Sequence, residues 1–201
     1  MDKTENLTDL GGLGQRFLAF KRKLFDKLYE SLNERQREAV FTVNGPLLVL
    51  AGAGSGKTTV LVQRIAYMIK YGNSYFSDRL PASLSQADVE RLQTALSYDR
   101  EGMEAVLSEY IENPCPPWSV LAITFTNKAA GEMKERLAGQ LGEDIASDLW
   151  TGTFHSVCLR MLRKYTEQAG YKPGFTICDT EDSKRVFSQC FKELNIDEKL
   201  L

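Results

Sequence analysis

The sequence predicts an α/β fold in which helices flank a parallel sheet, and three observations support this prediction. Short apolar runs of strand length alternate with longer segments of helical spacing, which is the pattern of βα units. A glycine-rich loop lies between one such run and the helix that follows it. The chain has 201 residues, 43% of them hydrophobic and 26% charged, so it has room for one domain with a hydrophobic core.

The order of the expected elements follows from apolar spacing and from cap and turn residues. The run 47–50 is expected to be a strand buried on both faces, because four consecutive apolar residues are typical of one. The expected elements are helices at 15–30 and 33–41, the strand at 47–50, helices at 57–71, 86–96 and 102–111, a strand at 120–125, a helix at 128–141, a strand at 150–153, a helix at 155–168, an extended run at 175–178 and a helix at 181–194.

The segment 73–117 departs from the βα rhythm. Its predicted helices are acidic, since residues 77–112 carry eight acids against three bases, whereas the whole chain has a net charge of only −2. We therefore expect an acidic helical insertion at 73–117 within the α/β domain, with the role of a spacer or lid. The segment 1–31 is expected to be a helical extension that packs on the domain.

Several classes of protein are excluded. The N-terminus has neither a basic region nor an apolar core of the signal-peptide type, and no apolar run is long enough to cross a bilayer. We expect a cytoplasmic protein with no membrane partner. The four cysteines form no CxxC pair, so we expect reduced thiols, mostly in the core, and no zinc site.

The residues 51–58, AGAGSGKT, lie where a phosphate-binding loop must lie, between a strand and a helix. Glycines let successive backbone N–H groups turn toward phosphates, and the helix N-terminus adds its positive dipole end. Lys57 is expected to neutralise phosphate charge and the Thr58 hydroxyl to bind Mg²⁺, so these two are the candidate catalytic residues. The first position is alanine where the general pattern has glycine. The expected ATP-binding residues here are Ala51, Gly52, Ala53, Gly54, Ser55, Gly56, Lys57, Thr58 and Thr59.

Gln36 is a second candidate for the nucleotide site. It lies 21 residues before Lys57 on a helix that Asn33 and Gln36 would open as a capping box. A glutamine amide can both donate to and accept from the adenine edge. Taken alone, this position is more typical of a surface glutamine on a capped helix.

Four blocks in the same order together resemble superfamily 1 DNA helicases of the UvrD/PcrA/Rep group. They are Gln36 with its neighbours, the segment 45–58, VLAITFTNKAAGEM at 120–133 and TGTFHSVCLRMLR at 151–163. The resemblance covers 32–72 and 118–197. Nuclease-linked helicases of the RecB/AddA kind share a P-loop and a TFTN-like block and remain an alternative, although Lys128 and the Phe154-His155 pair are more similar to the UvrD/PcrA side.

The resemblance implies a P-loop NTPase domain of the RecA-like type at 32–178, incomplete, with 179–201 as the start of an inserted helical subdomain. It implies that Gln36 reads adenine. It also implies that Thr59 stands where several relatives carry an arginine near the base, so we expect looser base selectivity. The residues implied to contact single-stranded DNA are Phe125, Thr126, Asn127, Thr153, Phe154 and His155, with Phe125 offering a face for base stacking.

Hydrolysis in this class needs a carboxylate pair for Mg²⁺ and water. After Thr59 there is no apolar run that ends in Asp-Glu. We therefore expect the front part of a longer ATP-dependent 3′–5′ DNA helicase that uses ATP and Mg²⁺ and does not hydrolyse ATP alone. Its expected partners are single-stranded DNA or single/double-strand junctions and the remainder of the helicase chain. A complete small P-loop kinase or NTPase and a non-catalytic P-loop DNA-binding module are the other readings.

Overall fold

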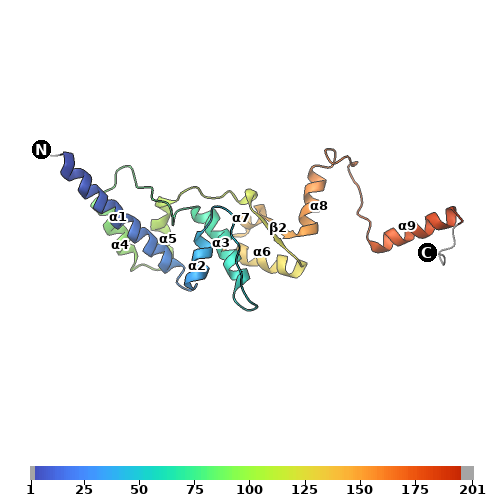
Figure 1. Ribbon diagram of the computed structural model, residues 1–201, viewed down its shortest axis with the longest axis horizontal. Coiled ribbons are helices and arrows are strands. Elements are labelled where there is room, and N and C mark those ends of the chain that lie inside the picture. The colour runs from blue at the N-terminus through green and yellow to red at the C-terminus, as the bar shows by residue number, and fades with distance from the viewer. Residues whose placement is uncertain (1–2, 196–201) are drawn as a thin grey trace. The chain divides into compact units, whose positions relative to one another are not determined.

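The computed structural model describes residues 3–195 (Figure 1). The chain divides into two compact units, one ending at Phe154 and the other beginning at His155. In chain order the elements are α1 (Lys3–Leu28), α2 (Glu34–Phe41), α3 (Lys57–Tyr71), α4 (Gln86–Ala95), α5 (Arg100–Leu107), the 3-10 helices η1 (Ser108–Tyr110) and η2 (Pro117–Ser119), β1 (Leu121–Thr124), α6 (Asn127–Leu141), α7 (Glu143–Asp148), β2 (Trp150–Thr153), α8 (Phe154–Lys164) and α9 (Thr180–Glu193). No helix in this described part is long and apolar enough to cross a membrane.

The local signals in the sequence predicted the helices well. The helix expected at 57–71 has these bounds in α3. The capping box of α2 is formed, since the Asn33 side chain accepts from the Gln36 N–H (2.9 Å) and the Gln36 Oε1 accepts from the Asn33 N–H (3.0 Å). At the start of α4, Asp88 accepts from the Ser85 N–H (2.8 Å). Caps depend on contacts between near neighbours, so the sequence reveals them.

The prediction of a strand at 47–50 is wrong. These residues form no strand, and Leu48 and Leu50 are 82% and 86% exposed. A buried parallel strand needs neighbouring strands on its sides to accept its hydrogen bonds, and no described strand lies beside 47–50. Within the described residues the sheet consists of β1 and β2 only, which pair in parallel from Leu121 opposite Trp150. The fold is a mixed helical one with a two-stranded parallel sheet, not a complete RecA-like sheet.

Other expectations need smaller corrections. The extended run expected at 175–178 forms no strand, and its Ile177 is exposed. The helix expected at 15–30 begins already at Lys3, and the one expected at 155–168 ends at Lys164. The helix α7 was not expected. The cysteines are unpaired thiols, but Cys178 and Cys190 are exposed, so the expectation of core residues is wrong for these two.

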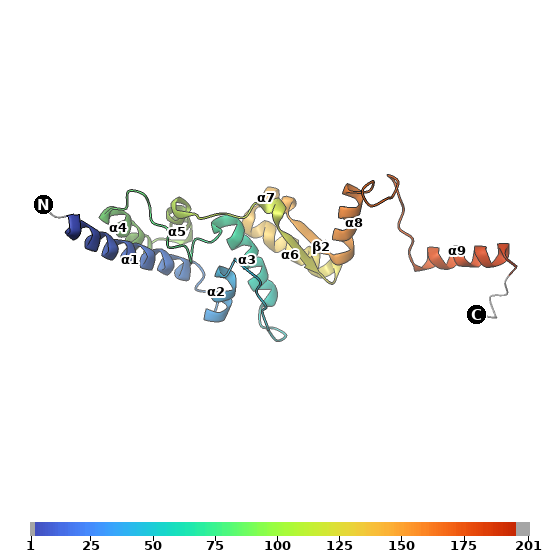
Figure 2. The ribbon, with the colours of Figure 1, turned by 45° about the horizontal axis from the view of Figure 1, so that its top comes forward.

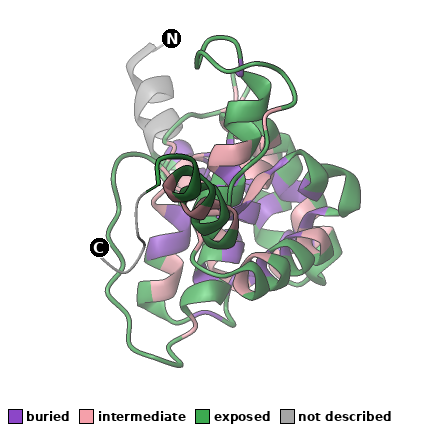
Figure 3. Ribbon diagram, turned by 90° about the vertical axis from the view of Figure 1, so that its right-hand side faces the viewer, coloured by how far each residue is buried: buried purple, intermediate pink, exposed green. Residues whose placement is uncertain are grey.

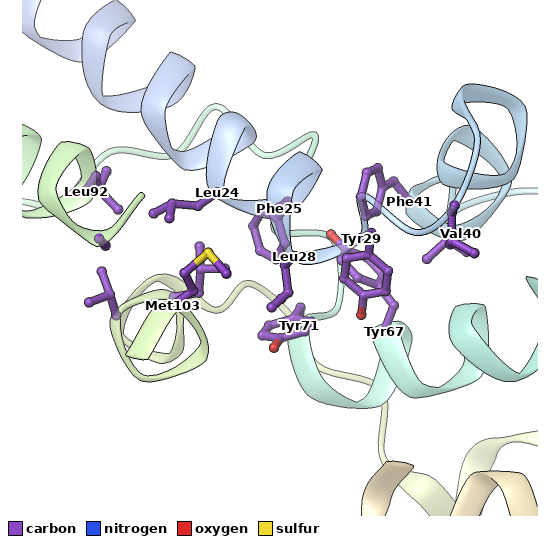
Figure 4. Packing of buried hydrophobic residues seen from close by; sticks show 14 of the residues in the cluster. Leu24, Phe25, Leu28, Tyr29, Val40, Phe41, Tyr67, Tyr71, Leu92 and Met103 are labelled. Carbon is purple, nitrogen blue, oxygen red and sulfur yellow. The ribbon is translucent and has the colours of Figure 1, made fainter. Parts of the chain in front are cut away.

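The N-terminal helix and the acidic insertion share one hydrophobic core. Figures 1 and 2 show α1 lying alongside α4 and α5, and Figure 4 shows side chains of α1 packed between those of α5 and α3. At the C-terminal end of α1, the Leu28 carbonyl accepts a hydrogen bond from the Arg100 Nη1 of α5 (3.1 Å). The buried residues of this cluster are Phe17, Leu24, Phe25, Leu28, Tyr29, Leu32, Ala39, Val40, Phe41, Val60, Tyr67, Tyr71, Val89, Leu92, Ala95, Met103, Val106 and Leu107.

The helix α3 belongs to two cores. Tyr67 and Tyr71 face the cluster just described, whereas Val62 and Ile65 belong to a second cluster with β1, α6 and α7. The remaining buried members of the second cluster are Ala66, Val120, Ala122, Met133, Leu137, Leu141, Ala146 and Leu149. The buried residues of the described chain, purple in Figure 3, lie mostly on helices. Because α3 contributes to both cores, its middle and C-terminal turns are packed on two sides, while Val60 in the first turn belongs to the first cluster.

The segment 73–117 begins and ends beside the C-terminal end of α3. Gly72 and Glu112 form a parallel bridge, and the Asn73 N–H donates to the Glu112 carbonyl (2.8 Å). The Cys115 N–H then donates to the Met68 carbonyl in the last turn of α3 (2.9 Å). These bonds close the base of the segment 73–117, so its helices are anchored where they enter and where they leave.

Lys21 on α1 is the buried cation of this core. It is 1% exposed, and its Nζ donates to the Ser77 carbonyl of the insertion (2.7 Å). Burial, with a smaller contribution from Arg22, lowers the pKa of Lys21 to about 8 from 10.5, although Glu112 and Asp78 oppose the shift.

This low pKa predicts a pH dependence of stability. Between pH 8 and 10.5 the unfolded chain binds more protons at Lys21 than the folded chain, so the free energy of unfolding rises with pH there. We expect a gain of about 2 kcal/mol between about pH 7 and pH 9.5, measured by urea unfolding. Burial raises the pKa of Tyr29, Tyr67 and Tyr71, so the trend reverses above pH 10, where the unfolded tyrosines ionise first. The Lys21→Met variant lacks the rise; an unchanged rise in this variant would contradict the assignment.

Candidate functional site

The glycine-rich loop ends at the first residue of α3. Gly54 and Gly56 have φ angles of 75° and 80°, and Gly56 is the N-cap residue of the helix. Residues with a side chain rarely adopt these angles, so the loop conformation needs glycine at both places. The loop residues 51–55 are exposed. An anion placed here would meet the free N–H groups and the positive dipole end of α3.

Lys57 folds back over this loop. Its Nζ donates to the carbonyls of Ala51 (3.1 Å) and Gly52 (2.6 Å), and the Ser55 hydroxyl donates to the same Gly52 carbonyl (2.7 Å). The ammonium group therefore lies against the loop backbone. A bound phosphate there would replace the two carbonyls as its hydrogen-bond acceptor. Thr58 and Thr59 follow in the first turn of α3, and both are exposed.

The residues present fit a magnesium–nucleotide complex at this loop. Lys57 supplies a cation, Ser55 and Thr58 supply hydroxyls, and the first turn of α3 supplies backbone donors. Among the described residues there is no group of three or more histidines, cysteines or carboxylates that could hold a metal ion by itself. A metal would thus be held by the Thr58 hydroxyl together with phosphate oxygens.

Gln36 lies beside the loop. Its Nε2 donates to the Ser55 carbonyl (3.1 Å), while its Oε1 holds the Asn33 N–H in the capping box. A Cβ on Gly56 would lie 3.2 Å from the Gln36 Nε2, so the two residues are in close contact. The structure therefore brings Gln36 close to the glycine-rich loop before Lys57, although Gln36 and Lys57 are 21 residues apart in the sequence.

Arg64 is a residue of this site that sequence reasoning missed. Its Nη1 donates to the Ala39 carbonyl (2.5 Å) and to the Thr42 carbonyl, both at the C-terminal end of α2. Burial lowers the pKa of Arg64, but a guanidinium stays charged at neutral pH. In the sequence Arg64 looks like any polar residue of a surface helix. Its spacing of seven residues from Lys57, two turns of the same helix, was the only available signal.

The expected DNA-contacting residues lie at the carboxyl edge of the two-stranded sheet. The register pairs Thr124 with Thr153 at the ends of β1 and β2. Phe125 follows β1 and is fully exposed, and Phe154 follows β2 and is 61% exposed. Two aromatic side chains thus come directly after paired strand ends, and neither is a core residue.

The segment after β1 is held in place by short-range hydrogen bonds. Thr126 is the N-cap of α6 and accepts from the Ala129 N–H (3.2 Å), while the Thr124 hydroxyl donates to the Thr126 carbonyl (3.1 Å). Asn127 is the first residue of α6. His155 is exposed and is the first residue of the second unit, so its place relative to Phe125 is not defined.

Comparisons with known proteins identify the family of the chain. The family model described as the UvrD/REP helicase N-terminal domain matches residues 32–96 and 103–201. Three relatives carry the name ATP-dependent DNA helicase PcrA. The protein of Leuconostoc citreum is 37% identical over 172 residues, that of Bacillus subtilis 40% over 174, and that of Staphylococcus aureus 41% over 172. These alignments cover 86–87% of this chain but only 18% of each relative, so the chain spans under a fifth of their length.

Proposed function

Because the chain belongs to the family of UvrD/REP helicase N-terminal domains, we propose that it is the front part of an ATP-dependent 3′–5′ DNA helicase or translocase. In this proposal it binds Mg-ATP and contacts single-stranded DNA. The observation that carries the proposal is the junction of Gln36 with the phosphate loop, where Nε2 lies 3.1 Å from the Ser55 carbonyl. A phosphate loop alone would fit many NTPases, whereas an amide beside it adds a means of reading the base.

Each residue of the loop has a proposed role at the nucleotide. Residues 51–56 and the first turn of α3 surround the phosphates with N–H groups. Lys57 exchanges its two carbonyl partners for phosphate oxygens, and Thr58 ligates Mg²⁺. Gln36 hydrogen-bonds the adenine edge. Because Thr59 has no charge, the selectivity for adenine over other bases is lower than with an arginine at this position. The bound Mg²⁺ would neutralise phosphate charge.

The DNA strand is proposed to cross the edge where β1 and β2 end. Phe125 offers a fully exposed ring for stacking on a base, and Phe154 lies after the paired strand. The hydroxyls of Thr126 and Thr153, the amide of Asn127 and the backbone of these residues contact the sugar-phosphate chain. His155, the first residue of the second unit, is proposed as a further DNA contact. Contacts of this kind tolerate any sequence, as a translocase requires.

Hydrolysis is proposed to need residues from outside this chain. The sequence after Thr59 contains no apolar strand ending in Asp-Glu, and the described residues contain no carboxylate cluster suited to a metal. The match to the UvrD/REP family and to PcrA relatives favours this parent over a RecB/AddA-like nuclease-helicase. We therefore propose that the rest of the helicase chain supplies the residues that hydrolysis needs.

Equilibrium binding of a fluorescent ATP analogue with Mg²⁺, and of a labelled oligonucleotide, tests this proposal. The account expects both ligands to bind, ATP displacing the analogue. Failure of the chain to bind any nucleotide, combined with DNA binding that ignores nucleotide, would contradict it and favour a non-catalytic DNA-binding module.

Phe125→Ala is expected to weaken binding of single-stranded DNA roughly tenfold, because one base–aromatic stack contributes about 1–3 kcal/mol. Fluorescence anisotropy at constant salt measures this. Phe76→Ala is the matched control, since Phe76 is a half-exposed phenylalanine of the insertion, and it should bind DNA like the wild type. Equal affinities of the wild type, Phe125→Ala and Phe76→Ala for DNA would show that Phe125 does not contribute to DNA binding.

A further inference from the structure

We propose that Arg64 is a positioning residue for base recognition: it fixes the C-terminal end of α2 to the phosphate-loop helix and thereby sets where Gln36 meets adenine. This inference rests on the proposed nucleotide-binding function and adds a residue to it. Arg64 itself does not touch the nucleotide. Its effect passes through α2, which carries Gln36 in its first turn.

The helix α2 is held to the nucleotide site at both of its ends. In its first turn, Gln36 donates to the Ser55 carbonyl of the loop (3.1 Å). At its last turn, the carbonyls of Ala39 and Thr42 both accept from the Arg64 Nη1. The last carbonyls of a helix lack intrahelical donors, and a cation there also meets the negative end of the helix dipole. One guanidinium therefore satisfies two carbonyls and is favoured by charge.

The helix α3 carries both anchors of the site. Lys57 is its first residue, and Arg64 lies seven residues later, a rise of about 10 Å along the helix axis. Two cores pack on α3, so the distance between these two residues is fixed. The phosphate end of a nucleotide is placed by Lys57 and the base-reading helix by Arg64. The separation between phosphate and base contacts is thus set within one rigid element.

The other contacts of α2 are mainly apolar. It has only eight residues, and a helix of this length is not stable in isolation. The segment after it, 44–55, is exposed throughout. Its remaining anchors are the buried side chains of Ala39, Val40 and Phe41. The Phe41 ring stacks on that of Tyr75 (4.2 Å between centroids) and contacts those of Phe25, Tyr29 and Tyr67 at 5.2–6.2 Å. Apolar packing holds the helix against the core, but it is not directional, so the two polar bonds from Arg64 set its orientation.

The test compares ATP with inorganic tripolyphosphate as competitors of the fluorescent ATP analogue, both with Mg²⁺. Tripolyphosphate has no base, so it reports the loop alone. We expect Arg64→Met to weaken ATP binding roughly five- to tenfold, the size of one or two lost hydrogen bonds, and to leave tripolyphosphate binding within about twofold. Gln36→Ala should give the same pattern, and the double variant should be no worse than either single variant, because both remove the same base contact.

Arg35→Met is the matched control, since Arg35 is an exposed arginine on α2 that pairs only with Glu38 of the same helix among the interactions described. It should bind both ligands like the wild type. If Arg64→Met loses its cooperative thermal transition, Arg64→Lys takes its place. This variant keeps the charge but reaches less far, so its loss for ATP should be smaller and still specific to the base.

The possible results separate the inference from the function on which it rests. Equal weakening of ATP and tripolyphosphate by the Arg64 variant would show a general loss of the loop and overturn the positioning role. The positioning role would also be overturned if Arg64→Met bound ATP and tripolyphosphate with the same ratio of affinities as the wild type while Gln36→Ala weakened ATP binding. A wild-type chain that binds neither ligand would instead overturn the proposed function itself, and the inference with it.

Discussion

Replacing Gly72 by alanine is expected to open the base of the insertion and to lower the free energy of unfolding by about 4 kcal/mol or more. A Cβ at this position would lie 2.1 Å from the Glu112 carbonyl oxygen and 2.2 Å from that of Asn113. Both atoms belong to backbone, so no side chain can turn aside. Gly72 also has a φ of 57°, which adds to the strain of any other residue. Urea or thermal unfolding measures the loss.

Gly142→Ala separates the two causes of that loss. Gly142 has a φ of 88°, but nothing lies within 4 Å of a Cβ there. Its replacement should therefore lower stability by only about 1–2 kcal/mol, the cost of the backbone angle alone. A similar small loss in both variants would mean that the segment 112–113 can move away from α3, and the closed base of the insertion would then not be a rigid feature.

Replacing Lys57 by alanine is expected to weaken binding of Mg-ATP roughly 30-fold, about 2 kcal/mol, because charged hydrogen bonds to phosphate are lost. Unlike Arg64→Met, this variant should also weaken binding of tripolyphosphate, since Lys57 acts on phosphate and not on the base. Lys57 is the exposed first residue of α3 and pairs with carbonyls of the exposed loop before it, so its removal should leave the thermal transition unchanged.

Lys134→Ala is the control for Lys57→Ala. Lys134 is an exposed lysine of α6, so this variant makes the same change in net charge away from the loop. It should bind ATP like the wild type. Equal losses in the two variants would indicate general electrostatic attraction, and a normal affinity in Lys57→Ala would exclude the loop as the phosphate site.

The helices and their caps could be predicted because their signals are local. The Asn33–Gln36 capping box and the glycines before Lys57 act within a few residues, and the structure contains both. The strand at 47–50 could not be predicted correctly from its own residues. Its apolar run indicates burial, but strand formation also needs hydrogen-bond partners, and the described residues place none beside it.

The long-range parts of the structure left little trace in the sequence. The packing of α1 on the insertion depends on pairs such as Phe17 with Tyr110 and Lys21 with Ser77, which are more than fifty residues apart. The Arg64 contacts join two helices through main-chain carbonyls, which any residue type at 39 or 42 would supply. Gly72 looks like an ordinary helix terminator until Glu112 is seen against it.

For the candidate site, the residues could be predicted from motifs and from the chemistry of their side chains. The phosphate loop and Gln36 were singled out by what an amine, an amide and free N–H groups can bind, and the structure brings them together. Phe125 and Phe154 came from the resemblance to the helicase family, and in the structure they follow β1 and β2, whose ends are in register. The roles of these residues at ATP and DNA stay predictions.

The most direct test of the central claim is ATP turnover by the purified 201-residue chain, with and without single-stranded DNA, and with Lys57→Ala as the control for contaminating activity. The account predicts that the chain binds Mg-ATP but shows no turnover above that of the control under either condition. Turnover that DNA stimulates and that Lys57→Ala abolishes would contradict it, because the chain would then supply its own metal-binding carboxylate.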